Sequence, residues 1–410
     1  MGSTFSPHPD IRLLRDRLTV QSKKLLLKNL EDICLESIQT CILVANLCAA
    51  NASPSSEALF FRIAVSMAQI LRLTSLQPGD TLVVHEVKRR IWWSLFMADC
   101  WYSSGLNLPR QIQDRERPAA LPMDESIFHS LAIGKESLGG PHKLGLWAHM
   151  ITLVDLFGPI QDLNRRIVQE DLEDNEIDRC AYDISQRIED WEKTLPLDAK
   201  FNEENLREHK RRGTGGPFIA LHLGFHHYST LLYFQYLDVK RATTVDTKLY
   251  AERCKHHASS YSALLKVARS EEGLAAVYLT VGHMAVISSS VLLHTLLFDD
   301  EHRIRSARDS LNANFEALIE LEQYWPALKS IINRLIEFQN MCLLSATSHT
   351  HVLSKWMLRF LIEYALPIER DTTIVDTSVT GPELQVVSID TQRLEEQGRF
   401  TTFPTYEAKS

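Results

Sequence analysis

The sequence predicts an all-α protein, a large multi-helix, bundle-like domain followed by a disordered tail. Apolar residues recur at three- and four-residue spacing along most of the chain, which is typical of helices that face a core. No series of alternating polar and apolar residues predicts a β-sheet. The composition, 45% hydrophobic and 23% charged over 410 residues, is that of a globular chain. We expect an N-terminal segment (residues 1–20), one helical domain (20–365) and a disordered, Thr-rich tail (366–410).

The first helical region covers residues 11–50, where apolar side chains are spaced for one face (Leu26, Leu30, Ile33, Ile38, Ile42). A polar turn at 51–56 then breaks the chain. A second helix is predicted over 57–73, and its spacing places Leu59, Ile63, Met67 and Ile70 on one face. The Pro-Gly pair at 78–79 ends this region, and Asp80 or Thr81 is the expected N-cap of the next helix.

That next helix contains VKRRIWWSLFMADCWYSSGLNLPRQIQ, residues 87–113, with adjacent Trp92 and Trp93. Large apolar residues lie nearly all round it, so we expect a central helix with neighbours on several sides. Asn107 tolerates the left-handed conformation of a tight helix exit, and Pro109 cannot continue the helix.

Asp99 is the anomaly in this helix, because a buried carboxylate is costly unless it is paired. Arg89 and Arg90 lie roughly 15 Å away along the helix, too far for a direct bond. We therefore predict Arg110, just beyond the exit, as the partner of Asp99.

Further helices are predicted over 142–171, 176–194, 217–239, 246–270, 274–298, 303–323 and 325–363, the last with Pro326 in its first turn. Residues 196–217 are predicted to be a polar loop. The helix at 274–298 has no Asp, Glu, Lys or Arg and is long enough to cross a bilayer. Its serines and histidines favour the alternative, a helix buried inside a large protein.

Charge and cysteine content exclude several classes of protein. A net charge of −8 disfavours a surface broadly suited to nucleic acid. Seven scattered cysteines without a C-x-x-C pair predict neither a disulfide scaffold nor a zinc ribbon, and they fit a reducing compartment. The first residues lack the apolar stretch of a signal peptide.

The pattern RRIWW (89–93) with Asp99 and the exit at Pro109 resembles the signature helix of the fungal-specific transcription factor domain, the middle homology region of binuclear zinc-cluster regulators. Two segments in the first half agree with this resemblance: ESIQTCIL (36–43) and AVSMAQIL (64–71). The second half is similar to the cutinase-gene-regulator subgroup in three segments: HYSTLLYFQ (227–235), SSSVLLHTLLF (288–298) and YWP (324–326). The resemblance implies a non-enzymatic, nuclear regulatory domain that controls a metabolic or secondary-metabolite gene set.

The chain departs from the family pattern in two places. Asn107-Leu-Pro stands where family members read Gly-Arg-Pro. The family's zinc cluster begins C-x2-C-x6-C, whereas Cys34, Cys41 and Cys48 fall seven apart. We therefore expect no cofactor in this chain and contact with DNA only indirectly, unless a module upstream of this sequence supplies it. The alternative functions are a DNA-binding-deficient protein that titrates a full-length regulator, and an unrecognised helical enzyme.

Candidate functional residues follow from the same patterns. Polar groups in the apolar segment 282–294 suggest a small-molecule effector pocket at His283, Ser288, Ser289 and His294. Lys210, Arg211 and Arg212 are candidates for nuclear import, with a solvated loop as the alternative. His222 and His226 have zinc-ligand spacing but no obvious third ligand, so a metal site is not predicted. Expected partners are co-regulators, a full-length transcription factor or a second copy; a membrane is not expected, and the cytoplasm is the alternative to the nucleus.

Overall fold

A computed structural model describes residues 8–75, 77–113, 116–118, 120–131, 143–170, 172–238, 247–299, 301–347 and 355–366. These residues form fourteen α-helices, and within them the only β-type pairing is an isolated bridge between Met123 and Leu144. The predicted all-α class is therefore confirmed. Apart from Leu366, the predicted disordered tail lies outside the described residues.

The amino-terminal helices are α1 (Pro9–Lys28), α2 (Leu35–Ala50) and α3 (Pro54–Ile70), so the predicted region 11–50 is two helices. The predicted inner face of α3 is partly wrong. Met67 is buried, but Leu59 and Ile70 are 55% and 63% exposed. The buried face instead carries two bulkier aromatic side chains, Phe60 and Phe61, and the Phe61 ring stacks on Tyr102 at 5.5 Å.

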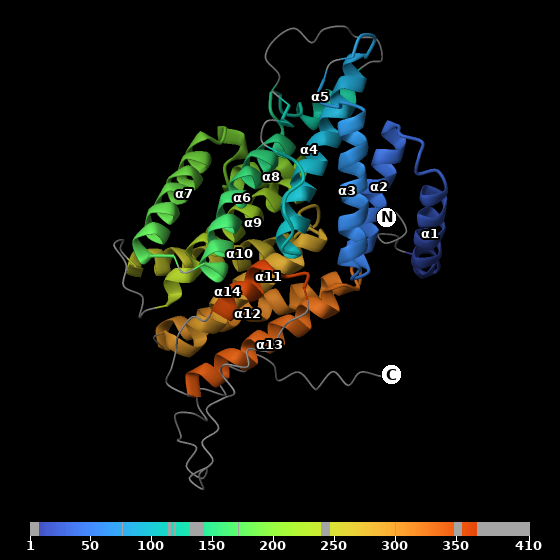
Figure 1. The fold of residues 1–410 in the computed structure, drawn as a ribbon. Coiled ribbons are helices and arrows are strands. Elements are labelled where there is room, and N and C mark those ends of the chain that lie inside the picture. The colour runs from blue at the N-terminus through green and yellow to red at the C-terminus, as the bar shows by residue number, and fades with distance from the viewer. Residues whose placement is uncertain are drawn as a thin grey trace.

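Helix α4 (Leu82–Gly105) contains the two adjacent tryptophans and packs against α2, α3 and α6. Of the two predicted caps, Thr81 is the N-cap, and its hydroxyl accepts a hydrogen bond from the backbone N–H of Val84. Asp80 forms an ion pair with Lys88. Figure 1 shows α4 between the amino-terminal helices and the middle of the molecule.

The middle helices are α5 (Glu125–Ser130), α6 (Leu146–Gln169), α7 (Asp174–Thr194), α8 (Glu203–Arg211) and α9 (Gly215–Tyr233), with short 3₁₀ turns at Leu197–Ala199 and Phe234–Leu237. The prediction of a loop over 196–217 is therefore wrong for residues 203–211, which form α8. The side chain of Asn202 caps this helix by accepting from the N–H of Asn205. Gly213, at φ +73°, allows the sharp turn that follows.

The last helices are α10 (Thr247–Ser270), α11 (Leu279–Phe298), α12 (Glu301–Glu322), α13 (Leu328–Thr347) and α14 (Lys355–Ile362). The single predicted helix 325–363 is therefore wrong, because α13 and α14 are separate. Pro326 precedes α13 rather than lying in its first turn. Figure 1 shows α11 to α14 gathered below the middle helices.

Helix α11 is the one helix in the described part of the chain that is long and apolar enough to cross a membrane. Of its most apolar window, 83% is buried inside the protein. The helix packs against α9, α10, α12 and α13. This burial agrees with the prediction of a core helix.

Candidate functional site

Helix α4 is largely buried in the interior of the molecule. Trp92 and Trp93 are 2% and 6% exposed, and the indole N–H of Trp93 donates to the carbonyl of Ala120 at 3.0 Å. Trp101, two turns further along, donates to the hydroxyl of Tyr228 at 3.0 Å. Helix α4 thus contacts neighbours on several sides, as its all-round apolar surface predicts.

Asp99 is fully buried, and its carboxylate accepts hydrogen bonds from several directions. The hydroxyl of Tyr102 donates at 2.8 Å, and the backbone N–H groups of Gln111 and Ile112 each donate at 2.9 Å. The predicted partner Arg110 lies 3.9 Å away, at the outer limit of an ion pair. Backbone amides, more than the guanidinium, therefore compensate this charge.

The exit of α4 is a left-handed cap centred on Asn107, at φ +52°. The N–H of Asn107 donates to Ser104, and that of Leu108 donates to Ser103 at 2.8 Å, the bonding pattern of a Schellman motif. Pro109 follows, and its carbonyl accepts from Arg62 at 2.8 Å. The predicted roles of Asn107 and Pro109 are confirmed.

Arg89 and Arg90 bind a second buried acid on α4 that the sequence analysis missed. Both guanidinium groups donate to the carboxylate of Glu86, at 2.6 and 2.9 Å, and Glu86 is 0% exposed. The N–H of Met123 donates to the same carboxylate at 3.0 Å. The i+3 and i+4 spacing from Glu86 was the available signal. The carboxylates of Glu86 and Asp99 thus fix the segment after α4 at two points, the N–H of Met123 and the N–H groups of residues 111 and 112.

Ser288 and Ser289, two of the four predicted effector residues, belong to a buried hydrogen-bonded cluster between α10, α11 and α12. The side-chain amide of Asn314 donates to both hydroxyls at 3.1 Å. Ser288 also donates to the carbonyl of Ala258 at 2.8 Å and lies 3.0 Å from the hydroxyl of Ser262. These contacts join three helices, and within the described residues the side-chain oxygen of Asn314 has no hydrogen-bond partner.

His283 and His294 lie on either side of that cluster, roughly 16 Å apart along α11. The ring of His283 lies 4.0 Å from that of Tyr364 and 5.6 Å from that of His227. Burial lowers the pKa of His283 well below its usual value, and the nearby His227 and Arg334 lower it further. The structure therefore does not bring the four predicted residues to one place.

Two residues connected to His283 through ring contacts carry buried polar atoms: the His227 ring lies beside that of His283, and Ser104 precedes Gly105, which the Tyr364 ring contacts. His227 and Ser104 are 4% and 5% exposed, and within the described residues His227 Nδ1 and Ser104 Oγ have no hydrogen-bond partner. Buried polar atoms without partners are found where a water or a ligand completes the bonding.

The segment after α14 covers this region. The hydroxyl of Tyr364 donates to the carbonyl of Trp101 at 2.9 Å, and the N–H of Ala365 donates to Gly105 at 3.1 Å. A Cβ at Gly105 would lie 2.6 Å from the Tyr364 ring, so only glycine allows this approach. Arg334 donates to the carbonyls of Phe360 and Leu366, which fixes the segment from the other side.

The histidines with zinc-ligand spacing have other partners. His222 lies 3.1 Å from the carbonyl of Ala199, and His226 Nδ1 lies 3.0 Å from His257 Nδ1. Burial lowers the pKa of both His226 and His257 to about 3, so the pair is neutral near pH 7. Among the described residues, no group of three or more His, Cys, Asp or Glu side chains is placed to hold a metal ion.

The basic residues 210–212 lie at the end of α8. Arg211 and Arg212 both pair with Glu208, and hydrogen bonds from the two guanidinium groups lower the pKa of Glu208 to about 2. Lys210 pairs with Glu271 at 3.0 Å. Arg211 is the most accessible of the three, with its side chain 72% exposed.

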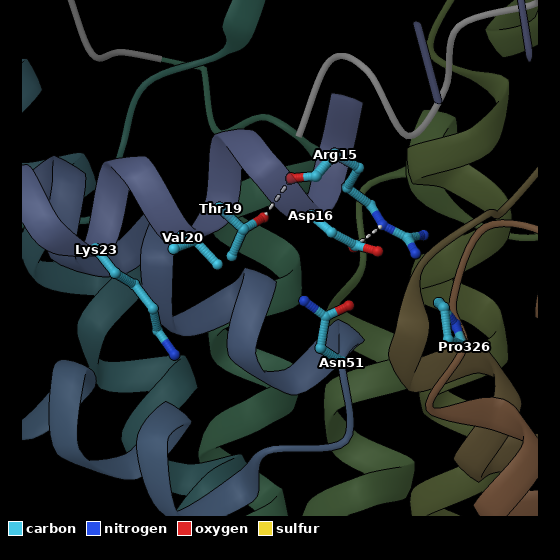
Figure 2. Close-up of a pocket in the computed structure, with 7 residues that line it drawn as sticks. All are labelled: Arg15, Asp16, Thr19, Val20, Lys23, Asn51 and Pro326. Atoms are coloured by element: carbon cyan, nitrogen blue, oxygen red, sulfur yellow. Dashed lines mark hydrogen bonds and ion pairs between the residues drawn. The ribbon is translucent and has the colours of Figure 1, made fainter. Parts of the chain in front are cut away.

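A cleft that the sequence gave no signal for lies beneath α1. Its volume is about 350 Å³, and it is lined by Arg15, Asp16, Thr19, Val20, Lys23, Asn51 and Pro326. Figure 2 shows the α1 side chains along one side, with Asn51 below them and Pro326 across the opening. Residues far apart in sequence form it, so no local pattern could predict it.

Comparison with known proteins gives a family match over the first part of the chain. Residues 1–193 match the model of the fungal specific transcription factor domain. The chain is 23% identical over 267 residues to the Zn(2)-C6 fungal-type transcription factor FTF1c of Fusarium oxysporum f. sp. lycopersici, covering 60% of this chain and 29% of the relative. It is 22% identical over 346 residues to the uncharacterized transcriptional regulatory protein C530.11c of Schizosaccharomyces pombe, covering 73% of this chain and 42% of the relative.

The chain thus spans less than half the length of these curated relatives. No solved structure matches it. The matched model covers α1 to α7, including the double-tryptophan helix and its exit. Extension of the domain to residue 365 and membership of the cutinase-regulator subgroup stay predictions. Over residues 1–193, the chain therefore matches the fungal specific transcription factor domain.

Proposed function

We propose that this chain is the regulatory part of a nuclear transcription regulator and that it controls a metabolic or secondary-metabolite gene set. The observation that carries the proposal is the family match over residues 1–193, together with relatives that are named as transcription factors. Transcription factors are not enzymes, and we propose no catalytic role. Lys210, Arg211 and Arg212, exposed at the end of α8, are the proposed nuclear-import segment.

The proposed mechanism is conformational. A small-molecule effector that binds one arrangement of the helices more tightly than another shifts the balance between an inhibited and an active state. Of the predicted effector residues, His283 has the most suitable surroundings, because its ring lies 4.0 Å from that of Tyr364 and 5.6 Å from that of His227, whose Nδ1 has no hydrogen-bond partner among the described residues. Ser288 and Ser289 are proposed to hold α11 against α10 and α12, and His294, near the other end of α11, is proposed not to touch the effector.

A tethering experiment tests the proposal. The chain is fused to a DNA-binding module of known operator, and transcription of a reporter is measured in a fungal host. We expect the fusion to change reporter output at least threefold relative to the DNA-binding module alone. Output equal to that of the module alone, at equal nuclear protein level, contradicts the proposal.

The alternative is an interaction protein that titrates a full-length regulator. Expression of the untethered chain separates the two functions. A titrating protein lowers promoter occupancy by the full-length regulator in proportion to its own level. An effector-responsive regulatory domain changes the reporter only when it is tethered.

A further inference from the structure

Helix α1 exposes far more apolar surface than it buries. Seven of its large apolar side chains are between 41% and 79% exposed: Ile11, Leu13, Leu14, Leu18, Val20, Leu25 and Leu27. Of its described apolar side chains, Leu26 alone is buried. A concentration of exposed apolar side chains on one element marks an interaction site more often than an ordinary surface.

The exposed apolar residues of α1 have the heptad spacing of a surface that binds another helix. Ile11, Leu18 and Leu25 are seven residues apart, and Leu14 lies between the first two at the other seam position of the heptad. The next such position is Gln21, which is polar and can fix the register of a partner. The seam spans about four turns, or roughly 21 Å from Ile11 to Leu25.

The positions that flank the seam are basic. Arg17 and Lys24 follow one edge, and Arg15 lies on the other, with Asp10 as the single acid among the flanking charges. Over its whole length α1 carries six cations and two anions, a net charge of +4 in a chain of net charge −8. Flanking charges of this kind select the sign of the partner.

The attachment of α1 leaves the seam accessible. The helix packs on α2, and Figure 1 shows it as the outermost helix of the amino-terminal edge. The cleft beneath it is lined by Lys23 and by Arg15, which pairs with Asp16 at 3.2 Å (Figure 2). Leu13, Val20 and Leu27 form a second apolar stripe at heptad spacing on another side.

We propose that α1 is a docking surface for an acidic, amphipathic helix of a partner protein. The partner places apolar residues on the Ile11, Leu14, Leu18 and Leu25 seam and carboxylates opposite Arg17 and Lys24. A second copy of α1 fits less well, because it brings the same net positive charge to the contact. This inference concerns a partner of the purified chain, so it does not depend on the proposed transcriptional function.

A designed peptide provides the probe. It has 21 residues, Leu at both seam positions and Glu at both flanking positions of each heptad; the control peptide has Lys in place of Glu. Binding to the full chain is measured by fluorescence anisotropy at low and at physiological salt. We expect the Glu peptide to bind at least tenfold more tightly than the Lys peptide, and the difference to shrink as salt rises.

Matched variants locate the binding. The triple variant Leu14→Ser, Leu18→Ser, Leu25→Ser should keep its circular dichroism spectrum and melting temperature and lose at least tenfold in affinity. Arg17→Glu with Lys24→Glu should reverse the peptide preference. A control with Leu197→Ser and Leu249→Ser, which changes side chains that are 83% and 47% exposed elsewhere, should bind as the wild type does.

Three results would overturn the proposal. The Lys peptide could bind as tightly as the Glu peptide, or the triple variant could retain full affinity. Alternatively, vesicles of phosphatidylserine and phosphatidylcholine, or a second copy detected by light scattering, could occupy the same leucines while the Glu peptide does not bind. In those last cases the seam is a membrane or self-association surface.

Discussion

Helices α1 and α4 both mix charged residues with large apolar ones, yet they use this composition in opposite ways. In α4 the carboxylates of Glu86 and Asp99 are completely buried and accept backbone N–H groups. In α1 Leu13, Leu14, Leu18, Leu25 and Leu27 are exposed, and Thr19 and Leu26 alone are buried among its described side chains. Similar composition therefore marks a structural centre in one helix and a contact surface in the other, and burial with specific partners makes the difference.

The first expectation, with the largest effect, concerns Asp99. Asp99→Asn removes the charge that the amides of Gln111 and Ile112 and the hydroxyl of Tyr102 bind. We expect the free energy of unfolding to fall by about 3 kcal/mol, because buried donors lose a charged acceptor. Urea denaturation measures it, with Asp190→Asn as control, since that side chain is 69% exposed. If the free energy of unfolding falls by less than about 0.5 kcal/mol in both variants, the charge of Asp99 does not stabilise the α4 exit.

The second expectation concerns Glu57, a half-buried acid in the first turn of α3. Burial raises the pKa of Glu57 from 4.5 to about 7. The folded-state pKa of Glu57 is above its unfolded value. The stability that the protonated carboxyl contributes is therefore complete below pH 4.5 and is lost as the pH rises through 7. We expect Glu57→Gln to stabilise the protein by about 2 kcal/mol at pH 8, with no such gain at pH 4.5.

Thermal unfolding across pH 4.5 to 8 measures this difference. The matched control is Glu36→Gln, which changes an exposed acid in the first turn of α2. A gain from Glu57→Gln that does not vary with pH would show that its carboxyl titrates normally. Glu57 would then resemble the exposed charges of α1 rather than a buried acid.

The third expectation concerns the segment that covers the end of α4. Gly105→Ala places a methyl group against the Tyr364 ring, although alanine itself favours the helix. We expect the segment 363–366 to detach, with a loss of about 1 kcal/mol after the gain in helix propensity. Proteolysis near residue 363 should accelerate. Tyr364→Ala in the same chain should remove the clash, so a double-variant cycle that shows no coupling contradicts the contact.

The smallest effect is expected on α1 itself. Leu18→Ala should change the free energy of unfolding by less than about 0.5 kcal/mol, because this side chain is 47% exposed. Leu95→Ala on α4, which is 0% exposed, should cost about 3 kcal/mol. Chemical denaturation of the two variants compares them directly. Equal losses would mean that α1 is as integral to the core as α4.

The sequence could predict what local chemistry decides. The apolar circumference of α4, its left-handed exit at Asn107 and the stop at Pro109 follow from neighbouring residues alone. The proximity of Arg110 to Asp99 was also predicted, since only one short turn separates them. The main partners of Asp99, however, are backbone amides, which no side-chain pattern reveals.

Other features depend on contacts between distant segments. Glu86 is buried because Met123 returns to α4, and the buried face of α3 is chosen by the packing of Phe61 against Tyr102. Likewise, Asn314 reaches Ser288 and Ser289 from another helix, which places these two serines in a structural cluster. Helix periodicity places a residue on a face, and tertiary packing decides what that face meets.

Hydrogen exchange of the unmodified chain, followed by mass spectrometry, tests the contrast between the two helices most directly. We expect amides of α4 and those of Gln111 and Ile112 to exchange among the slowest, near the rate of global unfolding. Amides of α1 should exchange at least a hundredfold faster, because little of that helix is buried. Equal protection of α1 and α4, or rapid exchange at Gln111 and Ile112, would contradict the account.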